Sequence, residues 1–238
     1  DRCHLVRGSG VDLERFRPPG EGASGAGNVS AETSSSDDEM ADGTVRGRER
    51  IVILFASRLL REKGLDELVE AFRAVHRERP EVALWIAGER YAPNPSSYSA
   101  DEVRALGEVE GVRLLGHVED MPGLLARVDI VALPSWREGT PKILLEAAAC
   151  GLPIVATDIP GCRGLVVDGE SGLLVPVRDA QALAAALARL AGHPGLRADY
   201  GARGREIVAA GFSREKVLED TIAVYDRLTG GAVTGGGG

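Results

Sequence analysis

The feature that most constrains the fold of this chain is an alternation of short, apolar, β-branched runs with longer stretches of helical periodicity. The runs predict strands over 51–56, 82–87, 112–115, 130–133 and 154–156, with a short one near 173–175. Helices are predicted over 65–79, 99–108, 121–126, 141–150, 180–191, 194–209 and 214–228. This alternation is typical of a parallel sheet with helices on both faces. We predict an α/β, Rossmann-like domain that binds its ligand at the carboxyl ends of the strands.

Composition divides the chain into segments around that domain. Residues 18–48 are rich in Gly, Ser, Ala, Asp and Glu and have almost no apolar periodicity, which predicts a disordered linker. Residues 49–229 form the predicted compact domain, and the Gly-rich residues 230–238 are predicted to be a flexible tail.

Charge and hydropathy argue against several functions. A net charge of −8, from 36 acidic and 28 basic residues, disfavours nucleic-acid binding and offers no polybasic membrane patch. There is no run of the ~20 apolar residues that a membrane span needs and no signal-peptide pattern, so we expect a cytoplasmic protein. Cys3, Cys150 and Cys162 lack metal-ligand spacing, and Cys150 is predicted to be a buried thiol.

The segment from Trp136 to Gly151 places two carboxylates around the start of an apolar helix. Thr140 is a suitable N-cap, Pro141 suits the first helical position, and Gly151 stands where a left-handed residue can end the helix. Apart from Lys142 at its start, the side chains between these ends are apolar except for Glu146, so the helix should be buried almost all round.

Burying the Glu146 carboxylate in such surroundings costs folding free energy unless a partner forms a hydrogen bond with it. A pair of ligand hydroxyls is one candidate, and Lys142, four residues earlier on the helix, is the other. Glu138 precedes the helix, whose N-terminal N–H groups attract anions. An anion bound there would lie between Glu138 and Glu146.

A second candidate group follows the first strand. The sequence from Ser57 to Gly64 carries Arg58 and Lys63 in a strand-to-helix loop, where a guanidinium and an ammonium can both reach a diphosphate. For such a loop taken alone, exposure to solvent is the more common outcome.

Together these motifs resemble the retaining glycosyltransferases of family 4, which have the two-domain GT-B fold. Glu138 and Glu146 match the signature of two glutamates with a seven-residue spacer, and the Ser57–Gly64 loop matches a second pattern of the family. The resemblance implies that Glu138 is catalytic and faces the donor sugar, and that Glu146 binds the ribose. It assigns the donor diphosphate to Arg58, Lys63, Gly139, Thr140 and Lys142.

Two further motifs fall within the resemblance, which spans Ile51 to about Leu190. His117 and Val118 stand where the backbone of the family brackets the nucleobase, although a loop histidine on the surface is the commoner situation. Asp158 and Arg163 follow the fifth predicted strand, and an ion pair between them is as plausible as a contact with substrate.

The resemblance implies transfer of a sugar from a nucleoside diphosphate sugar, with UDP-sugars favoured, to an acceptor hydroxyl with retention of configuration. Polysaccharide or lipid-linked glycan biosynthesis is the implied setting, in the cytoplasm or at the inner face of a membrane. No metal or other cofactor is expected, because Arg58 and Lys63 neutralise the diphosphate and no Asp-x-Asp pair follows a strand.

The chain is expected to be the C-terminal, donor-binding half of such an enzyme. Gly8–Pro18 resembles the crossover between the two GT-B domains, so residues 1–17 are interpreted as a remnant of the N-terminal domain. That domain holds the acceptor site and would be supplied as a separate partner or by a longer chain. The alternatives are a non-catalytic nucleotide-sugar-binding module or inactive fragment and, with less support, a sugar-nucleotide epimerase.

Overall fold

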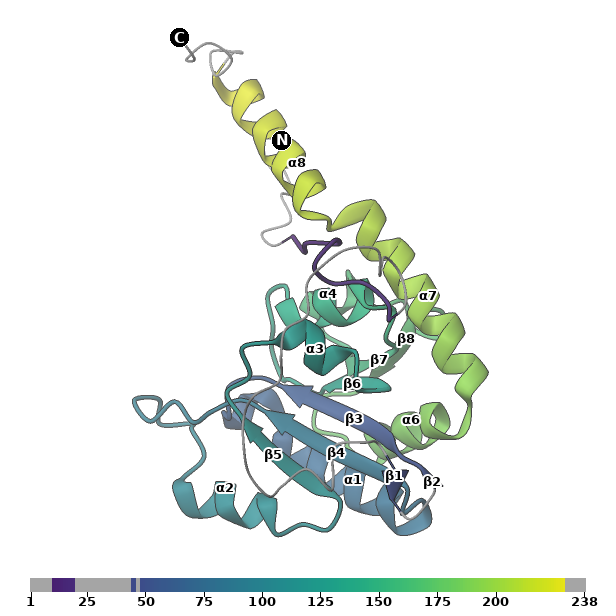
Figure 1. Ribbon diagram of the computed structural model, residues 1–238. Coiled ribbons are helices and arrows are strands. Elements are labelled where there is room, and N and C mark those ends of the chain that lie inside the picture. The colour runs from purple at the N-terminus through teal and green to yellow at the C-terminus, as the bar shows by residue number, and fades with distance from the viewer. Residues whose placement is uncertain (1–9, 20–43, 46–47, 230–238) are drawn as a thin grey trace, which may run out of the picture.

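The centre of the molecule is a fully parallel sheet. The computed structural model describes residues 10–19, 44–45 and 48–229. Its six-stranded sheet has the order β5-β4-β3-β6-β7-β8. The strands are β3 (Ile51–Ala56), β4 (Val82–Ala87), β5 (Val112–Gly116), β6 (Ile130–Leu133), β7 (Ile154–Thr157) and β8 (Gly172–Val175). Figure 1 shows them as a twisted layer inside the domain.

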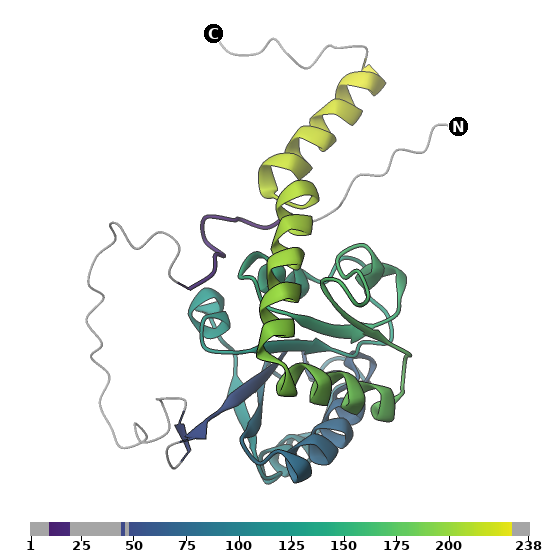
Figure 2. The ribbon, with the colours of Figure 1, turned by 90° about the vertical axis from the view of Figure 1, so that its right-hand side faces the viewer.

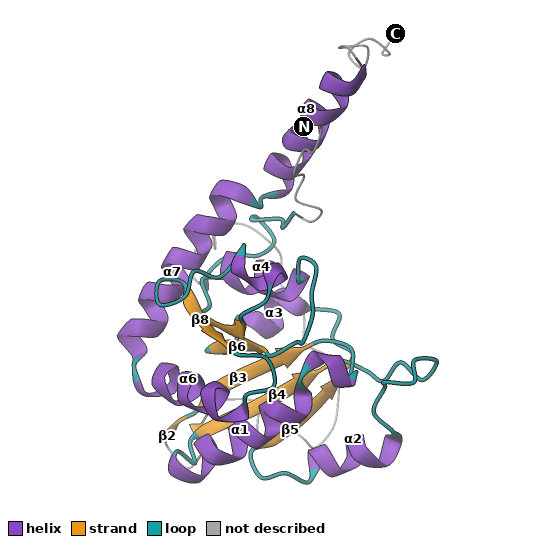
Figure 3. Cartoon of the chain, turned by 180° about the vertical axis from the view of Figure 1, so that it is seen from behind, coloured by secondary structure: helices purple, strands orange, loops and turns teal. Residues whose placement is uncertain are grey.

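Helices cover both faces of this sheet. The helices are α1 (Leu65–Glu78), α2 (Ala100–Gly107), α3 (Met121–Leu125), α4 (Lys142–Ala149), α5 (Pro160–Arg163), α6 (Ala180–Gly192), α7 (Pro194–Gly211) and α8 (Arg214–Thr229). Figure 3 shows α1 and α6 on one face, where they pack against each other, and Figure 1 shows α3 on the other. Strands β3, β4, β6 and β7 are buried almost throughout, as strands covered on both faces should be.

The predicted Rossmann-like fold is therefore confirmed, and the predicted strands and helices agree with the structure to within a few residues at each end. Two short helical turns were not predicted, η2 (Arg61–Lys63) and α5, which takes the place of a turn. The linker predicted over 18–48 and the tail over 230–238 lie mostly or wholly outside the described residues. Within the linker range, β1 (Thr44–Val45) pairs antiparallel with β2 (Arg48–Glu49).

The order of the strands locates the place where a ligand can enter. From β3 the chain moves outward to β4 and β5, then returns to pair β6 with the other side of β3. The carboxyl ends of β3 and β6 therefore flank the point at which the strand order reverses. In sheets of this kind, ligands bind in the crevice at such a point.

The segment 10–19 packs against the C-terminal helices. The N–H of Val11 donates to the carbonyl of Phe212 at 2.9 Å, and Arg214 donates back to Val11 at 2.9 Å. Val11 and Phe16 are buried in the core of the domain. Figure 2 shows this segment beside the junction of α7 and α8, from which α8 projects beyond the domain. No helix in the described ranges is long and apolar enough to cross a membrane.

Candidate functional site

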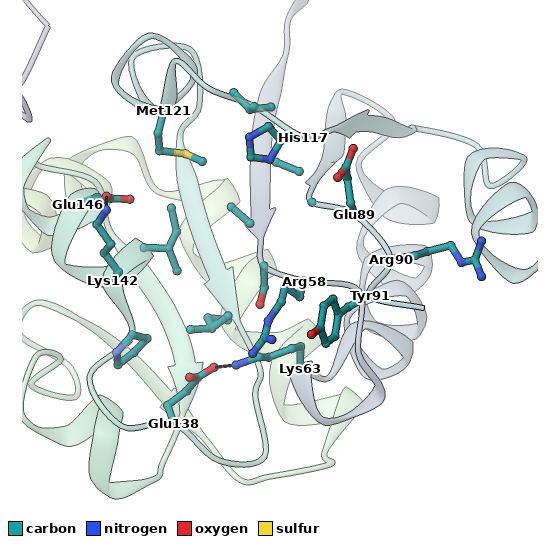
Figure 4. Close-up of a pocket in the computed structure, with 18 residues that line it drawn as sticks. Arg58, Lys63, Glu89, Arg90, Tyr91, His117, Met121, Glu138, Lys142 and Glu146 are labelled. Carbon is teal, nitrogen blue, oxygen red and sulfur yellow. Dashed lines mark hydrogen bonds and ion pairs between the residues drawn. The ribbon is translucent and has the colours of Figure 1, made fainter. Parts of the chain in front are cut away.

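A pocket of about 520 Å³ opens at the point where the strand order reverses. Residues that follow β3, β4, β5 and β6 line it, together with the first turn of α4. Among the residues predicted to bind the donor, it brings together Arg58, Lys63, His117, Val118, Glu138, Lys142 and Glu146. Figure 4 shows the charged side chains of this group around one space, with those from β3 and those from α4 on opposite sides.

Lys63 and Glu138 form an ion pair in this pocket. Lys63 Nζ donates to Glu138 Oε1 at 2.6 Å, and the side chains are only 14% and 13% exposed. Gly64 allows the approach, since it has φ of 73° and a Cβ at this position would lie 2.1 Å from the carbonyl oxygen of Pro134. The turn that carries Lys63 can therefore lie directly against the chain leaving β6.

Arg58 has a different environment from Lys63. Its guanidinium carbon lies 5.6 Å from the centre of the Tyr91 ring, within range of a cation–π interaction. No ion pair of Arg58 is found among the residues that the structure describes. Its charge is therefore not neutralised by a carboxylate there, and it lines the pocket beside the Lys63–Glu138 pair (Figure 4).

The start of α4 differs from the prediction by one position. Thr140 was predicted to be the N-cap, but the cap residue is Pro141, with φ of −71° and ψ of 114°, and no side chain caps the helix. The prediction was wrong because Pro141 adopts an extended conformation itself and does not begin the helix. The first N–H groups of α4 lack an intrahelical acceptor, as at the start of any helix, and no capping side chain takes its place.

This shift also changes which residues border the pocket. Pro141, Lys142 and Ile143 line it, whereas Gly139 is exposed and Thr140 half-buried, and neither contributes to the lining. The predicted left-handed residue at the other end of the helix is confirmed, since Gly151 has φ of 72°.

Glu146 is the buried polar group of α4. Its side chain is 8% exposed, and burial raises the pKa of its carboxyl above the usual value. Lys142 Nζ lies 3.4 Å from Glu146 Oε1, so the Lys142–Glu146 ion pair, the alternative to a contact between Glu146 and a ligand, is present. The Lys142 side chain is 77% exposed, however, and an ammonium in solvent offsets little of the cost of burying a carboxylate.

Several lining residues escaped the sequence analysis. Glu89, Arg90 and Tyr91 follow β4, and Met121 begins α3. The first three lie in a loop without periodicity, and the only available signal was their position after a strand that is followed by Gly88. Arg90 borders the pocket, but its guanidinium points away from the other charged side chains (Figure 4), where its Nε donates to the carbonyl of Tyr98 at 2.8 Å.

Other candidate residues have structural partners. Asp158 accepts from Arg163 Nε at 2.5 Å, and this bond holds the pKa of the carboxyl below its usual value. Cys150 and Cys162 are buried free thiols, as expected for Cys150, and burial raises their pKa values to about 11 and about 12. In the described part of the chain, no group of three or more His, Cys, Asp or Glu residues is placed to hold a metal ion.

Fold and pocket together define a class of protein, the Rossmann-like domains that bind a ligand where the strand order reverses. The family follows from the sequence, because residues 50–193 match the model of the glycosyl transferases group 1 family. The chain belongs to this family, and its Rossmann-like domain is of the type found in GT-B glycosyltransferases.

Curated relatives share this family. The chain is 32% identical over 234 residues to a D-inositol 3-phosphate glycosyltransferase of Salinispora tropica, covering 91% of this chain and 44% of that protein. It is 28% identical over 178 residues to the capsular polysaccharide biosynthesis glycosyltransferase CapM of Staphylococcus aureus, covering 75% and 46%. The chain thus spans about half the length of these relatives.

A solved structure agrees with this assignment. The pneumococcal O-GlcNAc transferase GtfA, in complex with UDP and GlcNAc, superposes with a TM-score of 0.65 and 28% identity. The similarity covers 76% of this chain and 37% of that one.

Proposed function

We propose that this chain is the donor-binding half of a retaining glycosyltransferase. It binds a nucleoside diphosphate sugar in the pocket between β3 and α4, and with an acceptor-binding half it transfers the sugar to a hydroxyl group. The observation that carries the proposal is one arrangement: Arg58 and Lys63 face the start of α4, with Glu138 and Glu146 among the other charged residues around the same space. The GtfA complex with UDP favours a uridine nucleotide.

Cations and helix N–H groups account for the chemistry at the leaving group. As the bond between sugar and phosphate stretches, negative charge grows on the diphosphate. Arg58, Lys63 and the uncapped N–H groups of α4 would stabilise that charge where it develops. Because two cationic side chains line the space, we propose a transfer that needs no divalent metal, and EDTA should leave the rate unchanged.

The two glutamates would act at the other parts of the donor. Glu138 follows β6 and would orient the sugar hydroxyls and favour the positive character that the sugar gains in the transition state. Glu146, buried on α4, would accept hydrogen bonds from the ribose hydroxyls. The backbone at His117 and Val118 would bracket the base. Attack on the face that the nucleotide leaves would retain the anomeric configuration.

An acceptor-binding half fits a second observation. Helix α8 exposes apolar side chains at one face, namely Leu218, Ile222, Tyr225 and Leu228, which are 45% to 67% exposed. Their spacing of three to four residues forms a stripe along a helix that projects from the domain (Figure 1). We propose that the acceptor half covers this stripe. The name of CapM favours a polysaccharide product. We propose that this product is made in the cytoplasm or at the inner face of a membrane, as the family resemblance implies.

Calorimetry with a panel of nucleotide sugars tests the binding step. UDP-glucose, UDP-N-acetylglucosamine and GDP-mannose are titrated into the chain, then into Arg58→Ala and Glu146→Ala variants. At least one ligand should bind, and both variants should weaken it. If both bind every ligand as the unmodified chain does, the pocket is not the donor site.

Turnover separates an enzyme from a binding module. The chain is supplied with its acceptor-binding half, and release of free nucleotide is followed with and without a glycan acceptor. A transferase releases nucleotide only with acceptor, whereas a non-catalytic module binds the donor and releases none.

A further inference from the structure

The loop that carries Glu138 is attached to the rest of the domain through Trp136. The indole Nε1 of Trp136 donates to Glu67 Oε1 at 3.0 Å, and its backbone N–H donates to the carbonyl of Glu62 at 2.8 Å. Arg178 lies on the turn that follows β8, and its guanidinium carbon is 3.8 Å from the centre of the Trp136 indole ring. Residues of α1, of η2 and of the turn after β8 therefore all contact Trp136.

These contacts connect the two members of the ion pair in the pocket. Glu62 immediately precedes Lys63, and Trp136 lies two residues before Glu138. The bond from Trp136 to Glu62 therefore joins the η2 turn directly to the loop after β6. That bond is made by the backbone, so the indole acts on the loop through its own contacts with Glu67 and Arg178.

A second close contact, with α5, holds the same loop. A Cβ at Gly161, in α5, would lie 2.1 Å from the carbonyl oxygen of Gly139 and 2.5 Å from that of Glu138. The backbone of Gly161 therefore touches the loop where any side chain would displace it. Gly164, three residues on, is a matched control, because a Cβ there meets nothing within 4 Å.

We infer that Trp136 and Gly161 are positioning residues, which set the place of Glu138 and so control recognition of the donor sugar rather than of the nucleotide. This inference rests on the proposed function of the pocket. Neither residue lines the pocket, so neither is expected to touch the ligand. Arg58, which lines it, follows a different strand and should not respond to changes in this loop.

The test compares affinity for a nucleotide sugar with affinity for the bare nucleoside diphosphate. Their ratio isolates the contribution of the sugar, and a loss of folded protein alone lowers both affinities together. Losing one well-placed hydrogen bond typically weakens binding about fivefold. Trp136→Phe and Gly161→Ala should each lower the ratio by about that factor with little change in affinity for the nucleoside diphosphate, and Gly164→Ala should leave the ratio unchanged.

Stability is separated from positioning by a further variant. In Trp136→Phe, Glu67 Oε1 loses its donor, and Glu67 Oε2 is already buried without a hydrogen-bond partner among the described residues. The half-buried carboxylate then has less to offset the cost of its burial. Adding Glu67→Met removes that carboxylate and should restore the melting temperature, while the ratio stays low. A ratio that recovers together with the melting temperature would overturn the positioning role.

The remaining outcomes are also decisive. If the unmodified chain binds no nucleotide, the proposed function fails. If it binds nucleotide and sugar nucleotide with the same affinity, Glu138 does not contact the sugar and the inference fails with it. If it shows a sugar contribution that both loop variants retain, the proposed function stands and the positioning inference is wrong.

Discussion

Replacing Glu138 with glutamine should tighten the binding of a nucleoside diphosphate, although the same change should abolish sugar transfer. In the pocket Lys63 Nζ is 2.6 Å from Glu138 Oε1, and both side chains are mostly buried. A diphosphate must therefore share Lys63 with an existing carboxylate, and it also meets that carboxylate's negative charge. Glu138→Gln removes both effects while keeping the size of the side chain.

The scale of the effect follows from Coulomb's law. Two unit charges about 4 Å apart interact by ~4 kcal/mol at an effective dielectric constant of ~20. Solvent screening and the retained hydrogen bond of the amide leave a net gain of about 1–2 kcal/mol, which corresponds to roughly 5- to 30-fold tighter binding. Calorimetry with UDP at fixed ionic strength measures this gain.

Two controls separate the pair from general charge effects. Glu89 lines the same pocket and is exposed, so Glu89→Gln should change affinity by less than about twofold. In a Lys63→Met background, Glu138→Gln should lose most of its benefit, since the competition for the ammonium is gone. Equal or weaker binding of UDP by Glu138→Gln would refute the reasoning.

Three further predictions concern other charged or titratable groups. Arg58→Ala should weaken UDP binding by about tenfold or more, whereas Lys142→Ala, which removes an exposed ammonium, should cost less than about threefold by calorimetry. Because burial raises the pKa of Glu146, affinity for a nucleotide sugar should fall as the pH is lowered, starting at a higher pH than an ordinary glutamate would give, and Glu146→Gln should flatten this profile. With pKa values of about 11 and about 12, Cys150 and Cys162 should resist iodoacetamide at pH 8 until the chain is unfolded, as mass spectrometry would show; rapid labelling of either thiol in the folded chain contradicts its burial.

Local patterns were sufficient to predict most of the fold. Each buried strand is a run of apolar residues bounded by turn signals, and α2 begins with a capping box in which Ser99 and Glu102 bond to each other's backbone. The N-cap of α4 was predicted one residue too early, because Thr140 is a preferred residue type for an N-cap and Pro141 for the first helical position. Backbone conformation, which composition does not specify, decided between the two.

Contacts between distant segments could not be predicted in the same way. Lys63 and Glu138 are 75 residues apart, and their pairing depends on β3 lying beside β6 and on the tight turn at Gly64. Trp136 and Glu67 likewise meet only after the sheet has formed. The sequence motifs indicated which residues belong to the site, whereas their ion pairs follow from the topology.

A structure of the chain with a bound UDP-sugar is the most direct test of the central claim. The diphosphate should lie between Arg58, Lys63 and the first N–H groups of α4, with the ribose at Glu146 and the sugar at Glu138. A ligand bound away from the reversal between β3 and β6, or held without Arg58 and Lys63, would contradict it.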